Sequence, residues 1–285
     1  MAGMGRPLRR LIICADDYGI SPGVSLGIRQ LAEAGRISAT GAMTCMPAWP
    51  EEAPLLRPLA EQVAVGLHFT LTDQQPLGGM PKTAPQGRLP GIGALLKDSI
   101  SGRLAMAEVA AELDRQLDAF EAHFGRPPDF VDGHQHVHLL PGVRGLVLSV
   151  FGRRLDPAHC WLRDCSDRAA ALIGRGQWAK AGFIALLGRG LRKAAAARGI
   201  ATNHGFSGFY DSRRGGLGPA LPRLLAGAGD GHLLMVHPGH VDAALMACDS
   251  LTTPREVEWT ALMGPAFLPF LASRGLKIAA RGFPR

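Results

Sequence analysis

Short apolar runs that end in a polar side chain recur along this chain, with helix-like segments between them. The first run, Leu11–Ala15, leads into Asp16 and Asp17. Later runs lead into three histidines: His68, His134 and His237. A continuous apolar run of this length is typical of a strand that is covered on both faces, as in a parallel sheet. Strands that alternate with helices therefore predict an α/β fold with parallel strands.

The number of predicted strands favours an irregular (β/α) barrel, with an open doubly wound sheet as the alternative. Strands are expected over residues 11–15, 38–46, 63–70, 129–134, 161–163, 200–204, 231–237 and 276–280. Helices are expected over residues 22–34, 49–60, 105–124, 166–198 (in pieces), 217–225 and 254–273. No Gly-x-Gly-x-x-Gly motif follows the first strand, so a dinucleotide site has no support.

We expect a single catalytic domain over residues 1–285, with two irregular additions. The chain is 285 residues long and 47% apolar, which is enough to bury one large core. Residues 72–103 are rich in Gly and Pro and have no clear period, so we expect a long loop there. Residues 166–198 are expected to form a helical insertion that is both apolar and basic.

Composition limits the partners and the compartment. The net charge is +7, but the basic residues are scattered and the chain has only two Tyr and four Trp, so nucleic acid is not an expected partner. Five cysteines without a Cys-x-x-Cys pair suit a reducing compartment. The run Leu11–Ala15 is too short for a signal segment, and no apolar stretch reaches the ~20 residues that span a bilayer. We therefore expect a cytoplasmic protein.

Three histidines and an aspartate fall within the stretch Asp132–His138. It follows the apolar Phe130 and Val131, so we interpret it as the end of a buried strand that continues into a loop. On a strand, His134, His136 and His138 would point to one face, where a core gains nothing from buried polar rings without partners. Metal ligation is a natural use of such a cluster, with the nearby carboxylate fixing an imidazole tautomer. The alternative is a polar loop with incidental histidines.

The polar residues that follow the predicted strands would meet at one rim of a barrel. Barrel enzymes build their active sites from side chains at the carboxyl ends of several strands. One carboxylate and two imidazoles give an open set of three ligands, which leaves positions for water and substrate on a catalytic metal. Zinc accepts mixed ligands and magnesium prefers oxygen, so we expect one divalent ion, Zn²⁺ or Mg²⁺. The second aspartate of the pair would then be free to act as a base.

Four motifs resemble those of the YdjC-like carbohydrate deacetylases, a family that includes chitooligosaccharide deacetylases. In chain order they are Ala15–Ile20, Gly66–Leu71 with the following Pro76 and Leu77, Asp132–His138, and Val236–Asp242. The resemblance covers nearly the whole chain and implies an irregular (β/α) barrel of the polysaccharide deacetylase type. Two residues depart from the family pattern: Tyr18 stands where Phe is usual, and Gln135 stands where His is usual. Gln135 is expected to alter the surroundings of the metal ligands.

The resemblance also implies roles for individual residues. Asp17, His68 and His134 would ligate the metal, and Asp16 would act as the general base. We take His237 as the general acid. The implied reaction is hydrolysis of the acetamide of an N-acetylated amino sugar, which gives acetate and a free amine.

Residues 203–211 and the extended 166–198 region resemble the family members associated with hopanoid biosynthesis. Those members are thought to deacetylate an N-acetylglucosaminyl hopanoid, which implies a lipid-linked substrate here, with free chitooligosaccharides as the alternative. The basic, apolar residues 180–198 would then contact the inner membrane face. An ordinary helix with a solvated basic face explains them equally well.

Further residues are expected to contact the substrate. Arg163 and the loop 72–103 would hold the sugar. Four others are expected to line the pocket: His136, His138, His204 and Tyr210. A homodimer is one expected oligomeric state.

Two other functions fit parts of the sequence. A metal-dependent phosphoesterase would bind more than one metal ion, and His136 and His138 could supply the additional ligands. A basic protein that binds RNA or lipid would use its histidines structurally, hold no metal, and bind with steep salt dependence.

Overall fold

Eight parallel strands form one curled sheet in the computed structural model, which describes residues 7–167 and 178–280. Along the sheet the order is β5-β4-β3-β2-β1-β7-β6, and β8 pairs with β1 outside this path. The strands are β1 (Arg9–Tyr18), β2 (Ala39–Ala42), β3 (Ala64–Phe69), β4 (Phe130–Gly133), β5 (Trp161–Leu162), β6 (Phe206–Ser207), β7 (His232–Val236) and β8 (Leu276–Ile278). Among the described residues, β5 is extended by an isolated bridge, Leu162–Thr202, and no ladder joins it to β6. The expected irregular parallel barrel is confirmed as a curled half-barrel.

β1 lies at the centre of the sheet, and its apolar residues Leu11 and Ile13 are fully buried. One edge of β1 pairs with β7 over Leu11–Ala15. The other edge pairs first with β8, from Arg9, and then with β2, from Cys14. Because both edges of β1 are paired up to Ala15 and β2 pairs again at Tyr18, the two aspartates between them are held from both ends.

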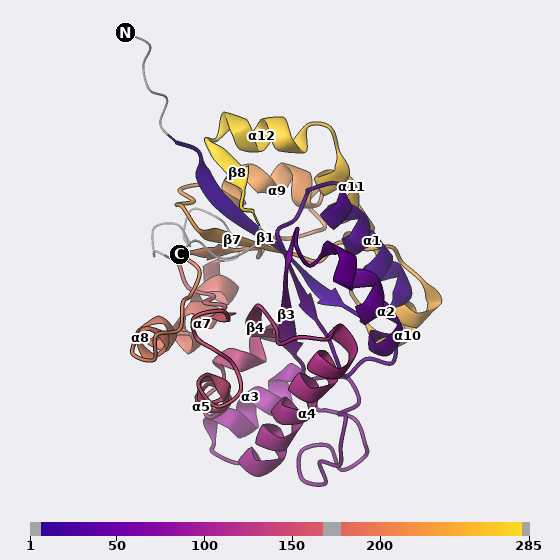
Figure 1. The fold of residues 1–285 in the computed structure, drawn as a ribbon, viewed down its shortest axis with the longest axis vertical. Helices are drawn as coiled ribbons and strands as arrows, with labels where there is room; N and C mark the ends of the chain where they lie inside the picture. Colours follow the sequence, from indigo (N-terminus) through magenta and orange to yellow (C-terminus); the bar gives the residue numbers. More distant parts are fainter. Residues whose placement is uncertain (1–6, 168–177, 281–285) are drawn as a thin grey trace.

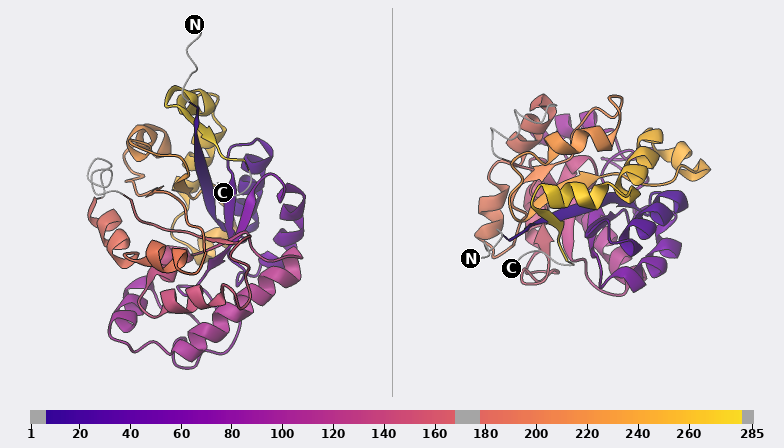
Figure 2. Two further views of the ribbon diagram at one scale, coloured as in Figure 1. Left: turned by 60° about the vertical axis from the view of Figure 1, so that its left-hand side comes forward. Right: turned by 90° about the horizontal axis from the view of Figure 1, so that it is seen from above.

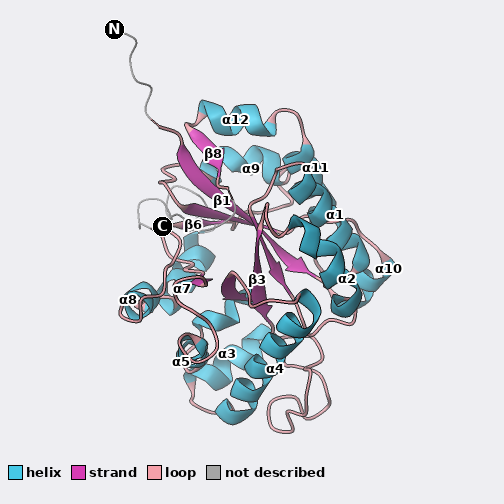
Figure 3. Cartoon of the chain, in the orientation of Figure 1, coloured by secondary structure: helices cyan, strands magenta, loops and turns pink. Residues whose placement is uncertain are grey.

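Helices surround the strands (Figures 1 and 3). They are α1 (Pro22–Glu33), α2 (Trp49–Leu56), α3 (Ile92–Ile100), α4 (Met106–Phe124), α5 (Val143–Val150), α7 (Trp178–Leu187), α8 (Leu191–Ala196), α9 (Leu217–Leu224), α10 (Ala243–Cys248), α11 (Thr253–Met263) and α12 (Phe267–Ser273), with the 3₁₀ segments η1 (Arg57–Leu59) and η2 (His134–Leu139). The left view of Figure 2 shows β1 running between α1 and α2 on one side and α7 and α8 on the other. None of the described helices is both long and apolar enough to cross a bilayer.

The boundaries of α1 follow from its end residues, as predicted. The side chain of Ser21 accepts a hydrogen bond from the backbone N–H of Val24 at 3.2 Å, and Pro22 opens the first turn. Gly35, just after the helix, has a φ of 64°, a conformation that glycine adopts without strain. These ends orient the buried face of α1 against the sheet.

The segment 72–103 is more ordered than its composition predicted. It contains α3, and glutamates of α4 hold the part before α3. Glu112 accepts from the backbone N–H of Leu77, and Glu108 accepts from those of Lys82 and Thr83. The expectation of an aperiodic loop is therefore wrong over Ile92–Ile100.

Two other predicted elements differ from the structure. The strand expected over 200–204 is reduced to the single bridge at Thr202, and β6 begins only at Phe206. The helix expected over 254–273 is divided into α11 and α12 at Gly264 and Pro265, because proline cannot continue a helical hydrogen-bond ladder. Part of the predicted helical insertion, 168–177, lies outside the described residues.

The histidine-rich stretch does not continue β4 as a strand. β4 ends at Gly133 and η2 follows, with Gln135 at φ 50° and His136 at φ 63°. These left-handed residues turn the chain sharply, so the alternation expected of a strand is lost. The strand predicted over 129–134 is present as β4, but His134, His136 and His138 do not share one face as they would on a strand.

Candidate metal centre and active site

The carboxyl ends of three strands bring an aspartate and two histidines together. Asp17 lies at the end of β1, His68 near the end of β3, and His134 directly after β4. Asp17 Oδ1 is 3.3 Å from His68 Nε2 and 3.0 Å from His134 Nδ1. One donor atom from each of these residues lies within 4.8 Å of the other two. These three residues, called here the Asp–His–His triad, are placed to share one cation.

A turn of the backbone at Asp17 separates the two neighbouring aspartates. Asp17 has a φ of 70°, which is uncommon for a residue other than glycine. The pairing of β1 with β2 shifts register at the same place, between Ala15 and Tyr18. As a result Asp16 contacts Arg163 whereas Asp17 contacts the two histidines. Two adjacent carboxylates thus acquire different partners.

A buried carboxylate fixes the orientation of His68. Asp132 stands opposite His68 in the pairing of β3 with β4, and its Oδ1 is 2.6 Å from His68 Nδ1. Burial alone would lower the pKa of His68, but the charges of Asp132 and Asp16 outweigh it and raise the pKa to about 10. Without a metal the ring is therefore protonated at both nitrogens at neutral pH: Nδ1 donates to Asp132, and Nε2, which faces Asp17, would exchange its proton for a bound metal.

Arg163 joins Asp16 and Asp132 in a buried network of charges. Its Nη1 donates to Asp16 Oδ2 at 2.7 Å, its Nη2 donates to Asp16 Oδ1 at 2.6 Å, and Nη2 is also 2.6 Å from Asp132 Oδ2. Burial alone would raise the pKa of Asp16, but the charge and hydrogen bonds of Arg163 outweigh it and hold that pKa below its usual range. Asp16 is therefore ionised at neutral pH, as a general base must be before it accepts a proton.

A second group of potential ligand atoms comes from Cys14, Asp16 and Asp132. Arg163 already occupies this position, with Nη2 at 2.9 Å from Cys14 Sγ and 2.6 Å from Asp16 Oδ1. A guanidinium and a metal cation would repel each other there. Across residues 7–167 and 178–280, the Asp–His–His triad is therefore the group that fits a divalent ion. The histidines expected to bind a second ion, His136 and His138, belong to neither group.

His237 reaches the same rim from β7. It directly follows Val236, the last residue of β7, and its charge contributes to the lowered pKa of Asp16. Its backbone N–H donates to Glu258 Oε2 at 2.5 Å, while the hydroxyl of Tyr210 donates to Glu258 Oε1 at 2.6 Å. Glu258 thus links two residues that the sequence predicted for the site, although no motif marked Glu258 itself.

Three residues that were expected to contact substrate are buried in the protein. Arg163 is fully buried among carboxylates. His138 is also fully buried, its Nε2 lies 3.2 Å from the carbonyl oxygen of Arg163, and burial lowers its pKa to about 4. His136 is 8% exposed and packs edge-on against Phe206 and Phe209. These positions favour structural roles over the predicted sugar contacts.

His204 lies toward the opposite end of the strands. Its backbone N–H donates to the carbonyl oxygen of Gly231, immediately before β7 begins, at 2.9 Å. The candidate site lies at the other end of β7, where His237 stands. The structure therefore does not bring His204 to the predicted pocket.

The structure adds Arg255 of α11 to the residues around the triad. Its Nη2 is 2.7 Å from Asp17 Oδ2 and 2.6 Å from Asp249 Oδ2. Burial alone would raise the pKa of Asp17, but Arg255 and His134 outweigh it and hold that pKa well below its usual range. Asp17 and Arg255 are separated by 238 positions in the sequence, so no local motif could have indicated this contact.

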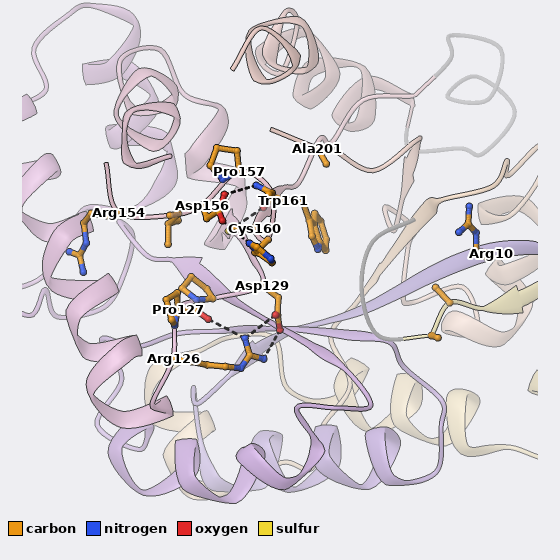
Figure 4. A pocket seen from close by; sticks show the side chains of 16 residues that line it. Arg10, Arg126, Pro127, Asp129, Arg154, Asp156, Pro157, Cys160, Trp161 and Ala201 are labelled. Atoms are coloured by element: carbon orange, nitrogen blue, oxygen red, sulfur yellow. Dashed lines mark hydrogen bonds and ion pairs between the residues drawn. The ribbon is translucent and has the colours of Figure 1, made fainter. Parts of the chain in front are cut away.

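A cavity of about 850 Å³ lies near the amino ends of the strands (Figure 4). Its lining includes Arg10 at the start of β1, Asp129 just before β4, and Trp161 at the start of β5. Arg10 pairs with Asp230, and Arg126, also in the lining, pairs with Asp129. The triad does not line this cavity. The candidate site is therefore identified by its chemistry and not by the size of a cavity.

Comparisons with known proteins agree with this fold. Chitooligosaccharide deacetylases of Yersinia pestis (strain Pestoides F) and Yersinia pseudotuberculosis (serotype O:1b, strain IP 31758) are each 29% identical to the chain over 277 residues, which cover 95% of this chain and 97% of theirs. A solved structure from Enterococcus faecalis V583, named for cellobiose-phosphate cleavage, has a TM-score of 0.72 and 22% identity, and the match covers 96% of this chain and 97% of that one. The sequence model of the YdjC-like protein family matches residues 10–273 of this chain. Because this match spans most of its length, the chain belongs to the YdjC-like protein family.

Proposed function

We propose that the chain is a metal-dependent carbohydrate deacetylase that removes acetyl from an N-acetylglucosamine-type sugar. The Yersinia relatives, which align over 95% of the chain, are named chitooligosaccharide deacetylases. The proposal depends most on the convergence of Asp17, His68 and His134 at the carboxyl rim, with Asp16 beside them. One carboxylate and two imidazoles suit Zn²⁺ and leave positions free for water and substrate, and Mg²⁺ is the other ion that we propose.

Each residue of the site has one task in the proposed hydrolysis. A bound divalent ion would supply the Lewis acidity that acidifies water and polarises a carbonyl group. Asp16 accepts a proton from the water whose oxygen attacks the acetamide carbon. Protonated His237 donates a proton to the nitrogen as the carbon–nitrogen bond breaks, which gives acetate and an amino sugar. Asp132 holds His68 in the tautomer that leaves Nε2 toward the site.

We further propose that the sugar is attached to a lipid of the hopanoid type. α7 contacts η2, the segment that begins with His134, and it exposes Phe183 (43%) and Leu186 (61%). Two exposed cations follow α7 in the sequence: Arg189 lies between α7 and α8, and Lys193 lies in α8. Apolar and cationic side chains together suit the surface of an anionic membrane. A site beside such a surface could receive a sugar that a membrane lipid presents.

Metal content and acetate release test the enzymatic proposal. Purified protein should bind one Zn²⁺ or Mg²⁺ per chain and release acetate from an N-acetylated sugar. A lipid-linked N-acetylglucosamine should have a higher kcat/KM than a free chitooligosaccharide. Absence of acetate release from both substrates by metal-loaded protein would contradict a deacetylase, and a preference for the free sugar would contradict only the lipid linkage. A stoichiometry above one ion per chain would favour the phosphoesterase alternative.

A liposome flotation assay tests the membrane surface. The parent protein should float with anionic liposomes at low salt, and the double variant Phe183→Ser, Leu186→Ser should not. Leu268→Ser provides the control, because Leu268 of α12 is similarly exposed, at 41%, on another part of the surface. Equal flotation of all three proteins would rule out α7 as the contact.

A further inference from the structure

The two carboxylate oxygens of Asp17 face different partners. Oδ1 is 3.3 Å from His68 Nε2 and 3.0 Å from His134 Nδ1, whereas Oδ2 is 2.7 Å from Arg255 Nη2. One oxygen therefore faces the position that a cation would share, and the other is held by a side chain from a distant helix. The left-handed backbone of Asp17, at φ 70°, gives the side chain this orientation.

The guanidinium of Arg255 is itself held by several contacts. Its Nη2 is 2.6 Å from Asp249 Oδ2, and its Nε donates to the carbonyl oxygen of Leu251 at 2.8 Å. The backbone carbonyl of Arg255 accepts from the N–H of Gly239, in the loop after β7, at 3.2 Å. The side chain is fully buried. Arg255 is thus positioned before any ligand binds.

A purely structural ion pair does not explain this arrangement well. Burying a guanidinium is costly, and its Nη1 is buried without a hydrogen-bond partner among the described residues. A buried arginine with an unmet donor stabilises a fold less than an apolar side chain of similar volume. The contact with Asp17 therefore indicates that the Arg255 side chain has a role in the candidate site.

We infer that Arg255 is a positioning residue that reserves Asp17 Oδ2 and so presents Asp17 to the metal as a ligand through one oxygen. The inference rests on the proposed metal-dependent function. Carboxylates bind cations through one or two oxygens, and a second oxygen would take a position that a catalytic site leaves to water or substrate. By holding Oδ2, Arg255 keeps that position open. Asp249 keeps Arg255 in the required orientation.

Substitution of Arg255 tests this role through the coordination of a bound metal. In Arg255→Met, Asp17 is expected to bind with both oxygens, so the visible absorption of the Co²⁺-loaded protein should weaken as the coordination number rises. Co²⁺ should still bind with a Kd within about tenfold of the parent value, while kcat falls about 10²-fold and KM changes little. Arg255→Lys keeps the charge, but its side chain is shorter and has no Nε to donate to Leu251, so it should show the same spectral change in part.

One control variant and one further test variant separate the possible results. Arg154→Met removes an arginine that pairs with Asp118 and Glu121 of α4, and it should leave the Co²⁺ spectrum unchanged. Asp249→Asn should shift the spectrum in the same direction as Arg255→Lys. Parent-like spectra for both Arg255 variants, or loss of Co²⁺ from folded Arg255→Lys, would overturn the inference. If the parent itself does not bind Co²⁺, the proposed function fails, and this inference fails with it.

Discussion

The two ends of the curled sheet hold charged residues in different ways. At the carboxyl ends, Asp16, Asp17 and Asp132 are almost fully buried, and each contacts a buried arginine. At the amino ends, the side chains of Arg10 and Asp230 pair while 41% and 46% exposed. Buried charges are costly to desolvate, whereas exposed pairs cost and contribute little. The chain therefore concentrates its costly charges where the candidate chemistry lies, although the 850 Å³ cavity lies at the other end.

The largest expected effect comes from replacing a histidine at the carboxyl ends of the strands, compared with one at the amino ends. His68→Ala should lose the bound metal. Its kcat/KM should fall by more than the roughly 10- to 100-fold that is typical when a residue that only hydrogen-bonds to a metal ligand is replaced. His159→Ala is the matched control, because His159 lines the amino-end cavity and is 73% exposed. It should keep both metal and activity. Metal analysis and acetate release measure both variants, and a metal-loaded His68→Ala would contradict the ligand assignment.

Replacing the proposed base should separate catalysis from metal binding. Asp16→Asn removes the proton acceptor but leaves the Asp–His–His triad intact, so kcat should fall by ~10²-fold or more while one metal ion per chain remains. The expected signature is a lower kcat with metal content equal to that of the parent. Near-parent turnover of this variant on a confirmed substrate would show that another group accepts the proton.

A smaller effect is expected from replacing Asp132, which contacts the proposed ligand His68 and is not itself proposed as a ligand. Asp132→Asn weakens the acceptor that holds His68 Nδ1 at 2.6 Å, so metal affinity or kcat/KM should fall roughly 10- to 100-fold. The melting temperature should also fall, because Arg163 loses one of its buried partners. Titration of the apo-protein with Zn²⁺ measures the affinity. An unchanged Kd would show that His68 keeps its orientation without this carboxylate.

The smallest effect is expected at the amino ends, from Asp230→Asn. Hydrogen bonds from Arg10 hold the pKa of Asp230 at about 2, below the usual aspartate value. The pKa of Asp230 is lower in the folded state than in the unfolded state. The ion pair therefore stabilises the fold at pH values above the usual aspartate pKa, and this contribution is lost as the pH falls from about 5 to about 2. The parent melting temperature should therefore decrease slightly more than that of the variant over this range. A loss of deacetylation at neutral pH would instead couple this end to the site.

Much of the fold could be predicted because its signals are local. The apolar run Leu11–Ala15 and the capping residue Ser21 each determine structure within a few positions, and the structure has a strand and a helix there. The polar residues after the runs could be placed together because parallel strands end on the same side. Asp17, His68 and His134 do converge at one end of the sheet.

The rest of the site depends on contacts between distant segments and on backbone strain. Arg255 and Glu258 stand on α11, far in sequence from the residues they hold, and arginines and glutamates are common on helix surfaces. The left-handed turns at Gln135 and His136 carry no glycine that would have indicated them. For this reason the sequence predicted a strand over 129–134 that runs into a loop, but not the turn that separates the three histidines.

Gly41 of β2 lies close to His68 on the neighbouring strand. A Cβ atom added at Gly41 would lie 3.0 Å from His68 Nδ1, the nitrogen that contacts Asp132. Even alanine would therefore require the ring to shift by a few tenths of an ångström beside its carboxylate. An engineering library that seeks a new substrate range is therefore best designed to keep glycine at this buried position. We expect a larger side chain there to lower activity through the position of His68 before it affects the rest of the fold.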